Sequence, residues 1–261
     1  MPVGKTETKS YTSQVICLKS YDYGEADKIL HLYSADHGRI SAMAKGAKRA
    51  NSKLSGACEL LALSEMQLTR GRNFDVVSQY QSLESYIGIR TDILKLACAM
   101  LYAELVHALA TEGDEDSQMI FTHLQTALAR LEVASERDII PLASAFQMRL
   151  LDLAGFRPML GHCLYSEQPV TPDIPYASFS AELGGVVLPE HRSHYPGTSW
   201  VNVSPATLLA LEGCAEALDP ALWAHADPAK TQKFLAYYTG RVLEKPLKAY
   251  AFVLQLLESP V

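Results

Sequence analysis

The sequence predicts an α+β protein in which a five-stranded β-barrel precedes an α-helical domain. Short segments of alternating apolar and polar residues fill the chain up to about residue 85. Longer segments with helical periodicity follow them, and a segment rich in Pro, Gly, Ser and Tyr interrupts the helices. We therefore expect two domains, residues 1–85 and residues 86–261, with an irregular insert at about residues 157–203.

The predicted strands are short and rich in β-branched and apolar residues. They cover residues 13–20, 27–34, 38–45, 57–68 and 74–85. In the third, Ile40, Ala42 and Ala44 occupy every second position and share one face. In the fourth, the apolar alternation shifts between Leu63 and Met66, which indicates a bulge and a bend. Five strands with a bulge in about 70 residues are typical of the OB barrel.

Helical periodicity replaces strand alternation beyond the barrel. Asp92 is placed to cap the first long helix, and Gly155 to end the third. Ser204 and Pro205 form an N-cap and first helical position, and Pro246 is expected in the first turn of the last helix. The remaining predicted helices cover residues 117–132, 138–154, 204–218, 229–243 and 245–257.

The composition favours a folded cytoplasmic protein. Hydrophobic residues make up 48% of the chain and charged residues 20%, which supports a packed core. The longest apolar stretch, residues 93–110, is interrupted by Lys95, Glu104 and His107, so we expect a buried helix and no membrane partner. The first residues lack the apolar segment of a signal peptide. Five cysteines without a tight spacing pattern are expected in a reducing cytosol.

Positive charge is concentrated in the N-terminal part of an acidic chain. The net charge is −6, but residues 1–80 carry 11 Lys or Arg and 8 Asp or Glu, a net charge of +3. The stretch GRISAMAKGAKRANSKLSG, residues 38–56, has no acidic residue. It holds the cations Arg39, Lys45, Lys48, Arg49 and Lys53. Several cations on a flexible loop of small residues suit a repeating phosphate backbone, so we expect these five to bind DNA. The alternatives are a solvated loop and, for Arg39, a surface ion pair with Asp36 or another nearby acid.

Further residues of the predicted barrel extend this surface. Arg70 and Arg72 flank a turn, and we expect them to contact DNA as well. Single-stranded binding also uses aromatic platforms. The aromatic candidates are Tyr21, Tyr23, Tyr33, Phe74 and Tyr80, each of which can instead belong to the core.

Four segments resemble the RecO family of bacterial recombination mediators. The first is YGEADKILHLYSADHGRISAMAKGAKRANSKLSGACEL, with an acidic turn, a strand, a Gly-Arg turn and a basic loop. LLDLAGFRPMLGHC, FSAELGGVVLPEHR and RVLEKPLKAYAFVLQL follow in the family's order, so the likeness runs from about residue 12 to residue 257. The resemblance implies an OB barrel and a helical domain with a zinc-binding insert. It also implies binding and annealing of single- and double-stranded DNA, partnership with single-strand-binding protein and RecR, and loading of RecA.

The insert departs from the family's zinc pattern of two Cys-x-x-Cys pairs. The corresponding positions are Cys163, Ser166, Leu188 and His191. A closed structural zinc site needs four ligands, and this set supplies two. His162 and His194 are near enough in sequence to complete a substitute set. We expect no zinc and no other cofactor, with ordinary packing holding the insert.

The helical domain offers a candidate surface for a partner protein. The helices of residues 92–155 are apolar and weakly charged, and a groove between them would suit the acidic, aromatic-ended tail of single-strand-binding protein. The cations available to hold the tail's carboxylates are Arg130, Arg137 and Arg149.

No motif of an enzyme active site is present in the sequence. The patterns GxxxxGK[ST], GxGxxG, HExxH and GxSxG are all absent. We expect a non-enzymatic DNA-binding mediator associated with the nucleoid. The alternatives are a protein-interaction adaptor that binds no nucleic acid, which the acidic net charge favours, and a metal-dependent hydrolase built on Cys163, His191 and His194.

Overall fold

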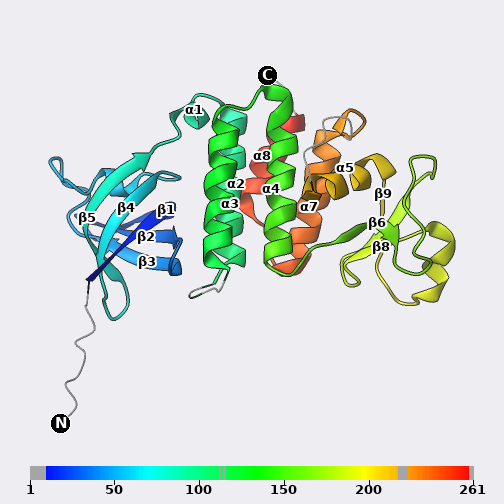
Figure 1. The fold of residues 1–261 in the computed structure, drawn as a ribbon, viewed down its shortest axis with the longest axis horizontal. Coiled ribbons are helices and arrows are strands. Elements are labelled where there is room, and N and C mark those ends of the chain that lie inside the picture. The colour runs from blue at the N-terminus through cyan, green and yellow to red at the C-terminus, as the bar shows by residue number, and fades with distance from the viewer. Residues whose placement is uncertain (1–9, 112, 114–115, 217–222, 259–261) are drawn as a thin grey trace, which may run out of the picture. The chain divides into compact units, whose positions relative to one another are not determined.

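The computed structural model describes residues 10–111, 113, 116–216 and 223–258, which fall into two compact units (Figure 1). The first unit consists of Met1–Ile87 and Ala110–Thr126, and the second of Gly88–Leu109 and Ala127–Val261. Blue and cyan strands form the first unit's barrel in Figure 1. No helix in the described ranges has the length and apolar character needed to cross a membrane.

Five strands close into a barrel in the order β1-β2-β3-β5-β4, which confirms the predicted OB-like barrel. They are β1 (Ser10–Tyr23), β2 (Asp27–Ser34), β3 (Gly38–Ala44), β4 (Leu63–Thr69) and β5 (Asp75–Glu84). Strands β3 and β5 pair in parallel, while β1 pairs with β2 and β4 in antiparallel fashion. The barrel core is filled by inward-facing residues that include Val15, Leu30, Leu32, Ile40, Ala42, Met66 and Leu68.

The fourth strand is shorter than the sequence predicts. A 3₁₀ turn, η1 (Gly56–Cys58), occupies the start of the expected strand, and Leu61 has a positive φ of 67°. A non-glycine residue in that conformation cannot continue a strand, so β4 begins only at Leu63. The register between β4 and β5 shifts between Leu63 and Ser64, but the extra residue is Leu83 of β5, so the bulge lies on the partner strand and not on the fourth strand as predicted.

The second unit is built on helices whose expected caps are in place. The helices within the described residues are α1 (Ile87–Arg90), α2 (Ile93–Leu109), α3 (Ser117–Glu132), α4 (Ile139–Leu153), α5 (Pro205–Glu216), α7 (Pro228–Val242) and α8 (Lys248–Glu258), with a 3₁₀ turn η2 (Glu136–Asp138) before α4. The Asp92 carboxylate accepts the N–H groups of Leu94 and Lys95, as predicted for an N-cap. The Ser204 hydroxyl accepts the N–H of Thr207 at 3.3 Å in the same way.

The last helix begins later than predicted. Glu244 has a positive φ of 55°, and α8 starts at Lys248, so Pro246 lies before the helix and not in its first turn. The carboxylate of Glu104 in α2 accepts the N–H groups of Lys248 and Ala249 at 3.3 and 2.8 Å. A carboxylate from a neighbouring helix therefore caps α8, and a local sequence pattern does not reveal such a cap.

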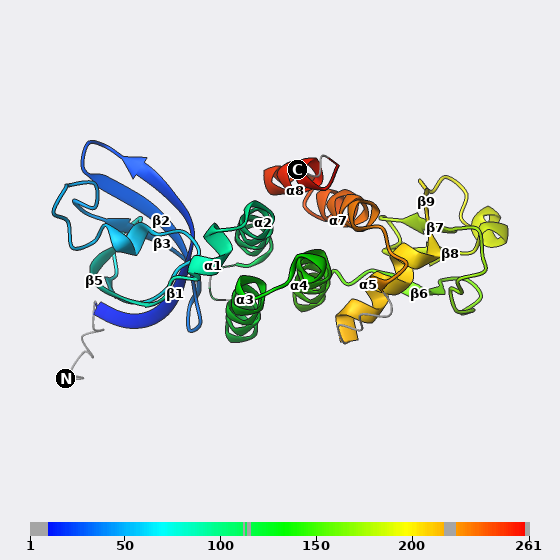
Figure 2. The same cartoon turned by 90° about the horizontal axis from the view of Figure 1, so that it is seen from above.

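The insert contains a small sheet where the sequence predicts irregular structure (Figure 2). Its strands are β6 (Met159–Cys163), β7 (Ala177–Ser180), β8 (Gly185–Val187) and β9 (Val201–Val203), in the order β6-β8-β7-β9. Strands of three to five residues are too short to give a readable alternation. Phe179 of β7 is fully buried and meets the rings of Phe234 and Tyr238 edge-on, which joins the sheet to α7.

Candidate nucleic-acid interface

The basic loop, defined as residues 45–53, leaves the end of β3 as a chain of hydrogen-bonded turns. The N–H of Arg49 bonds to the carbonyl of Gly46 at 3.1 Å, and that of Ser52 to the carbonyl of Arg49 at 3.0 Å. Gly46 donates its own N–H to the Asp27 carboxylate at 2.7 Å, and it has a φ of +68°. The N–H of Lys48 bonds to the carbonyl of Ala26 at 2.9 Å. The loop that the sequence suggests to be flexible is thus tied to the β1–β2 turn.

The predicted cations of the loop differ in their partners. The Lys48 ammonium lies 3.0 Å from the Asp22 carboxylate, which Lys28 also contacts at 3.2 Å. Hydrogen bonds from these two ammonium groups hold the pKa of Asp22 below its usual range. The other three cations are exposed and have no ion pair with any residue that the structure describes. They are Lys45, Arg49 and Lys53. These three are therefore the cations of the loop available to phosphates.

Two of the predicted aromatic platforms are exposed beside the loop. Tyr21 and Tyr23 are 50% and 51% exposed and flank Asp22 at the end of β1. Tyr33 is fully buried, so it cannot stack on a base. Phe74 and Tyr80 are half-buried, and Tyr80 packs against the barrel core. Of the five predicted platforms, Tyr21 and Tyr23 are therefore the ones whose rings are exposed.

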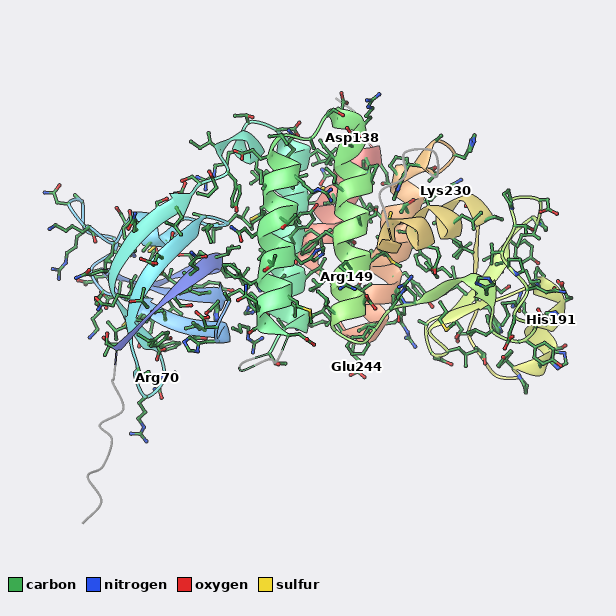
Figure 3. All side chains as sticks on the ribbon, in the orientation of Figure 1. Arg70, Asp138, Arg149, His191, Lys230 and Glu244 are labelled. Atoms are coloured by element: carbon green, nitrogen blue, oxygen red, sulfur yellow. The ribbon has the colours of Figure 1, made fainter. Side chains whose placement is uncertain are left out.

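The other predicted arginines line a separate polar hollow, which we call the arginine hollow. It has a volume of about 450 Å³, and Arg39, Arg70 and Arg72 all contribute to its wall. The residues that line it also include Tyr11, Asp36, His37, Ser41, Asn73 and Asp75. Figure 3 shows Arg70 at the β4–β5 turn of the barrel.

A network of contacts fixes the wall of the arginine hollow. The hydroxyl of Tyr11 donates to the Asp75 carboxylate at 2.5 Å, and the Arg70 guanidinium lies 4.9 Å from the centre of the Tyr11 ring. His37 meets the same ring edge-on at 4.7 Å. The Gly71 N–H donates to Asp75 at 3.0 Å. Burial, and secondarily the hydrogen bond to Asp75, raises the pKa of Tyr11, which keeps its hydroxyl neutral.

The seven predicted DNA contacts therefore form two groups, which the sequence does not distinguish. Arg39 lies near the start of β3 and Lys45 follows its end. Six residues of extended strand separate their backbones by about 20 Å. One group is the basic loop, and the other is the arginine hollow.

A second candidate surface lies in the helical unit, in a pocket of about 630 Å³ that we call the helical pocket. Arg130 and Arg137 line it, together with the apolar residues Val133, Pro141, Leu142 and Trp223. Val133 is 82% exposed, so the pocket presents an uncovered apolar side chain beside two cations. The pocket thus combines the two features expected of a site for an acidic, aromatic-ended tail.

The third predicted partner contact lies elsewhere on the helical unit. Arg149 is exposed on α4 and bonds to the Asp152 carboxylate (Figure 3). It is not among the residues that line the helical pocket.

Comparison with known proteins identifies the family. The family model "Recombination protein O N terminal" matches residues 9–86, and "Recombination protein O C terminal" matches residues 90–251. The chain belongs to the RecO family. It is 36% identical over 179 residues to the DNA repair protein RecO of Pelotomaculum thermopropionicum, covering 69% of this chain and 67% of that protein. It is 30% identical over 253 residues to the DNA repair protein RecO of Desulforamulus reducens, covering 96% of each.

The RecO insert of this chain does not fit a zinc ion. Cys163 is buried in an apolar cluster with Val187 and Leu188, and its sulfur accepts the Leu188 N–H at 3.4 Å. Leu188 has no metal-binding atom, and the described ranges contain no group of three or more His, Cys, Asp or Glu arranged to hold a metal. The described cysteines are all free thiols.

The two histidines of the insert contact an aromatic ring in this RecO chain. The Tyr165 ring stacks on His194 with centroids 3.9 Å apart and lies 5.0 Å from His191, which Figure 3 labels in the insert. The centroids of the two histidine rings are 6.1 Å apart. An aromatic cluster of Tyr165, His191 and His194 therefore occupies the part of the insert that holds two of the candidate zinc ligands.

Sequence reasoning missed two residues of the RecO barrel surface. Lys28 shares Asp22 with the basic loop, and Tyr11 supports Arg70 in the hollow. The sequence places Lys28 at the start of an alternating strand, which could have indicated its role. No local pattern indicates the role of Tyr11, because that role depends on residues about 60 positions away.

Proposed function

We propose that this chain acts as a DNA-binding recombination mediator in DNA repair. Its relatives are named DNA repair protein RecO. The observation that carries the proposal is the basic loop, where Lys45, Arg49 and Lys53 are exposed without ion pairs to described residues, beside Tyr21 and Tyr23. Cations hold phosphates and aromatic rings stack on bases, so this combination suits single-stranded DNA.

The proposed mechanism is electrostatic and needs no catalytic step. Cations on the barrel neutralise the phosphates of a bound strand and reduce its repulsion for a complementary strand. The protein thereby binds single- and double-stranded DNA and promotes annealing at the nucleoid. With RecR and single-strand-binding protein as partners, it promotes the loading of RecA. RecR is proposed as a partner because the resemblance to the RecO family implies it.

The salt dependence of single-strand binding tests this mechanism. If about four phosphates are neutralised, the logarithm of the affinity should fall against the logarithm of the salt concentration with a slope of roughly −3. A labelled oligothymidylate titrated at several salt concentrations measures this slope. Binding that does not change with salt would contradict the mechanism.

We further propose that the helical pocket binds the C-terminal tail of single-strand-binding protein. The apolar wall formed by Val133, Leu142 and Trp223 suits an aromatic end, and Arg130 and Arg137 suit carboxylates. Fluorescence titration with a synthetic acidic peptide that ends in Phe tests this site. A peptide with its acidic residues replaced by amides should bind weakly.

The alternative function is a protein-interaction adaptor without nucleic-acid binding. The net charge of −6 favours it. A gel-shift assay with labelled single strands at low salt separates the two, because an adaptor would leave the strands unshifted.

A further inference from the structure

The arginine hollow is a cation cluster distinct from the basic loop. Arg39 in its wall lies six residues, or about 20 Å, along β3 from Lys45. A hollow of about 450 Å³ is within the size range of sites that accept a small ligand group. The phosphates that contact the loop therefore do not themselves occupy the hollow.

The two arginines of the β4–β5 turn are available to an anion. Arg70 and Arg72 are exposed, and neither has an ion pair within the part of the chain that the structure describes. The Tyr11 ring supports the Arg70 guanidinium from one side, which limits its freedom before a ligand arrives. A planar guanidinium binds a phosphate through two parallel hydrogen bonds, so a supported arginine suits this ligand better than a mobile lysine.

The carboxylates of the hollow are engaged by other donors. Asp75 accepts from the Tyr11 hydroxyl and the Gly71 N–H, and Asp36 accepts from the Ser13 hydroxyl at 2.9 Å. Neither forms an ion pair with Arg70 or Arg72 among the described residues. Among the described residues that line the hollow, Arg70 and Arg72 therefore have no carboxylate partner. Ser41 and Asn73 add neutral polar groups that can bond to a sugar or a base edge.

The turn itself holds the two arginines close together. Gly71 stands between them, and a Cβ atom at this position would lie 2.0 Å from the Phe74 carbonyl oxygen. Only glycine fits this backbone, so the pairing of Arg70 with Arg72 is built into the turn.

We infer that the arginine hollow is a second, independent phosphate site that binds a second single strand while the basic loop holds the first. This inference rests on the proposed function and adds to it the number of strands that one chain carries. Two like-charged strands repel each other, and a carrier with one cation cluster for each strand brings them together without requiring either to leave. Annealing would then take place on a single barrel.

Counting bound strands by native mass spectrometry tests the inference. The probe is an oligothymidylate of about 10 nucleotides, which is within the length that one OB barrel covers. The whole protein should bind two strands per chain, and the R70Q/R72Q variant should bind one. The K45Q/R49Q variant, altered in the basic loop, should also bind one. A whole protein that saturates at one strand, or an R70Q/R72Q variant that still binds two, would overturn the inference.

Annealing assays separate this inference from the proposed function. The R70Q/R72Q variant should keep single-strand affinity within about threefold of the unaltered protein but lose at least about tenfold in annealing rate, because only the second strand is lost. If the unaltered protein bound no strand at all, the proposed function would fail. If the unaltered protein bound one strand per chain and the R70Q/R72Q variant annealed at the normal rate, only the inference would fail.

Two controls guard against charge and folding effects. K230Q/K233Q removes two positive charges from α7, where both lysines pair with acids, and should leave strand number and annealing unchanged. R72Q alone leaves the support of Arg70 by Tyr11 intact. The R72Q variant should also anneal more slowly than the unaltered protein, so the inference can be tested even if the double variant misfolds. If R72Q annealed at the normal rate and bound two strands, the result would count against the site.

Discussion

The ammonium group of Lys48 lies 3.0 Å from the carboxylate of Asp22, across the gap between the basic loop and the β1–β2 turn. The lysine also donates to the carbonyl of Gly24 at 3.4 Å. Lys48, which the sequence identifies as a DNA contact, is thus placed to tether the loop. The cations left for DNA are its neighbours in the loop.

Replacing Asp22 with Asn should strengthen single-strand binding. The change removes one negative charge and releases the ammonium groups of Lys28 and Lys48. Each additional cation that reaches a phosphate should steepen the salt slope by about 0.7. We expect a several-fold gain in affinity at low salt, measured by fluorescence anisotropy. Glu25→Gln is the matched control, because it removes the same charge from an exposed residue of the same turn. An equal gain in both variants would show that the ion pair is irrelevant.

The Asp22 ion pair should not respond to pH in the neutral range. The two ammonium groups hold the pKa of Asp22 below its usual range. The pair is therefore complete above the ordinary carboxyl pKa of about 4 and is lost only as the pH falls through the lowered value. The difference in affinity between the Asp22→Asn variant and the unaltered protein should be the same at pH 6 and pH 8. A difference that vanished at pH 6 would contradict this.

Replacing Gly71 with Ala should disturb the arginine hollow. The new Cβ would meet the Phe74 carbonyl oxygen, so the turn must rearrange at a cost of about 1–3 kcal/mol in the free energy of unfolding. Thermal unfolding measures this cost. Gly240→Ala in α7 is the control, because its Cβ would meet the Lys245 carbonyl oxygen at an ordinary 3.8 Å and alanine favours helix. Unchanged stability in Gly71→Ala would refute the close turn.

Charge reversal should distinguish the three arginines that the sequence predicts to contact a partner protein. Arg137→Glu and Arg130→Glu should each weaken binding of an acidic peptide ending in Phe about tenfold, because both residues line the helical pocket. Arg149→Glu has the same charge change outside this pocket and should bind normally. Isothermal titration calorimetry gives the three affinities. Equal affinities in all three variants would remove the pocket as the site.

Chelation should leave the insert intact. Since Cys163 lies in an apolar cluster and the histidines contact Tyr165, we expect EDTA to leave the unfolding temperature unchanged. Tyr165→Ala should lower stability by about 0.5–1.5 kcal/mol through loss of the ring contacts. Elemental analysis that finds one zinc per chain, with a lower unfolding temperature in EDTA, would contradict the packing explanation.

Local patterns in the sequence predict most of the barrel and the long helices. Strand β2 and helix α3 have the predicted bounds, because their periodicity is regular and their ends carry turn residues. The start of β4 was predicted wrongly, because the positive φ of Leu61 breaks the strand inside an apolar run. The start of α8 was predicted wrongly because its cap, Glu104, is more than 140 residues away.

The site is predictable in its residue types and less so in its geometry. Charge alone identifies the cations of the basic loop, since no acid lies among them. The pairing of Lys48 with Asp22 and the support of Arg70 by Tyr11 both join segments far apart in the chain. Only the closed barrel brings those segments together, so the division into basic loop and arginine hollow appears with the structure.

Annealing by a loop variant is the most direct test of the DNA-binding role. The K45E/R49E/K53E variant reverses the three unpaired cations of the basic loop and leaves Lys48 paired with Asp22. Annealing of two complementary oligonucleotides is followed by fluorescence transfer, with circular dichroism to confirm the fold. We predict that the variant stays folded, loses the strand that the basic loop holds, and anneals at least about a hundredfold more slowly at low salt. A folded variant that anneals as fast as the unaltered protein would contradict the proposal that the basic loop is a DNA-binding surface.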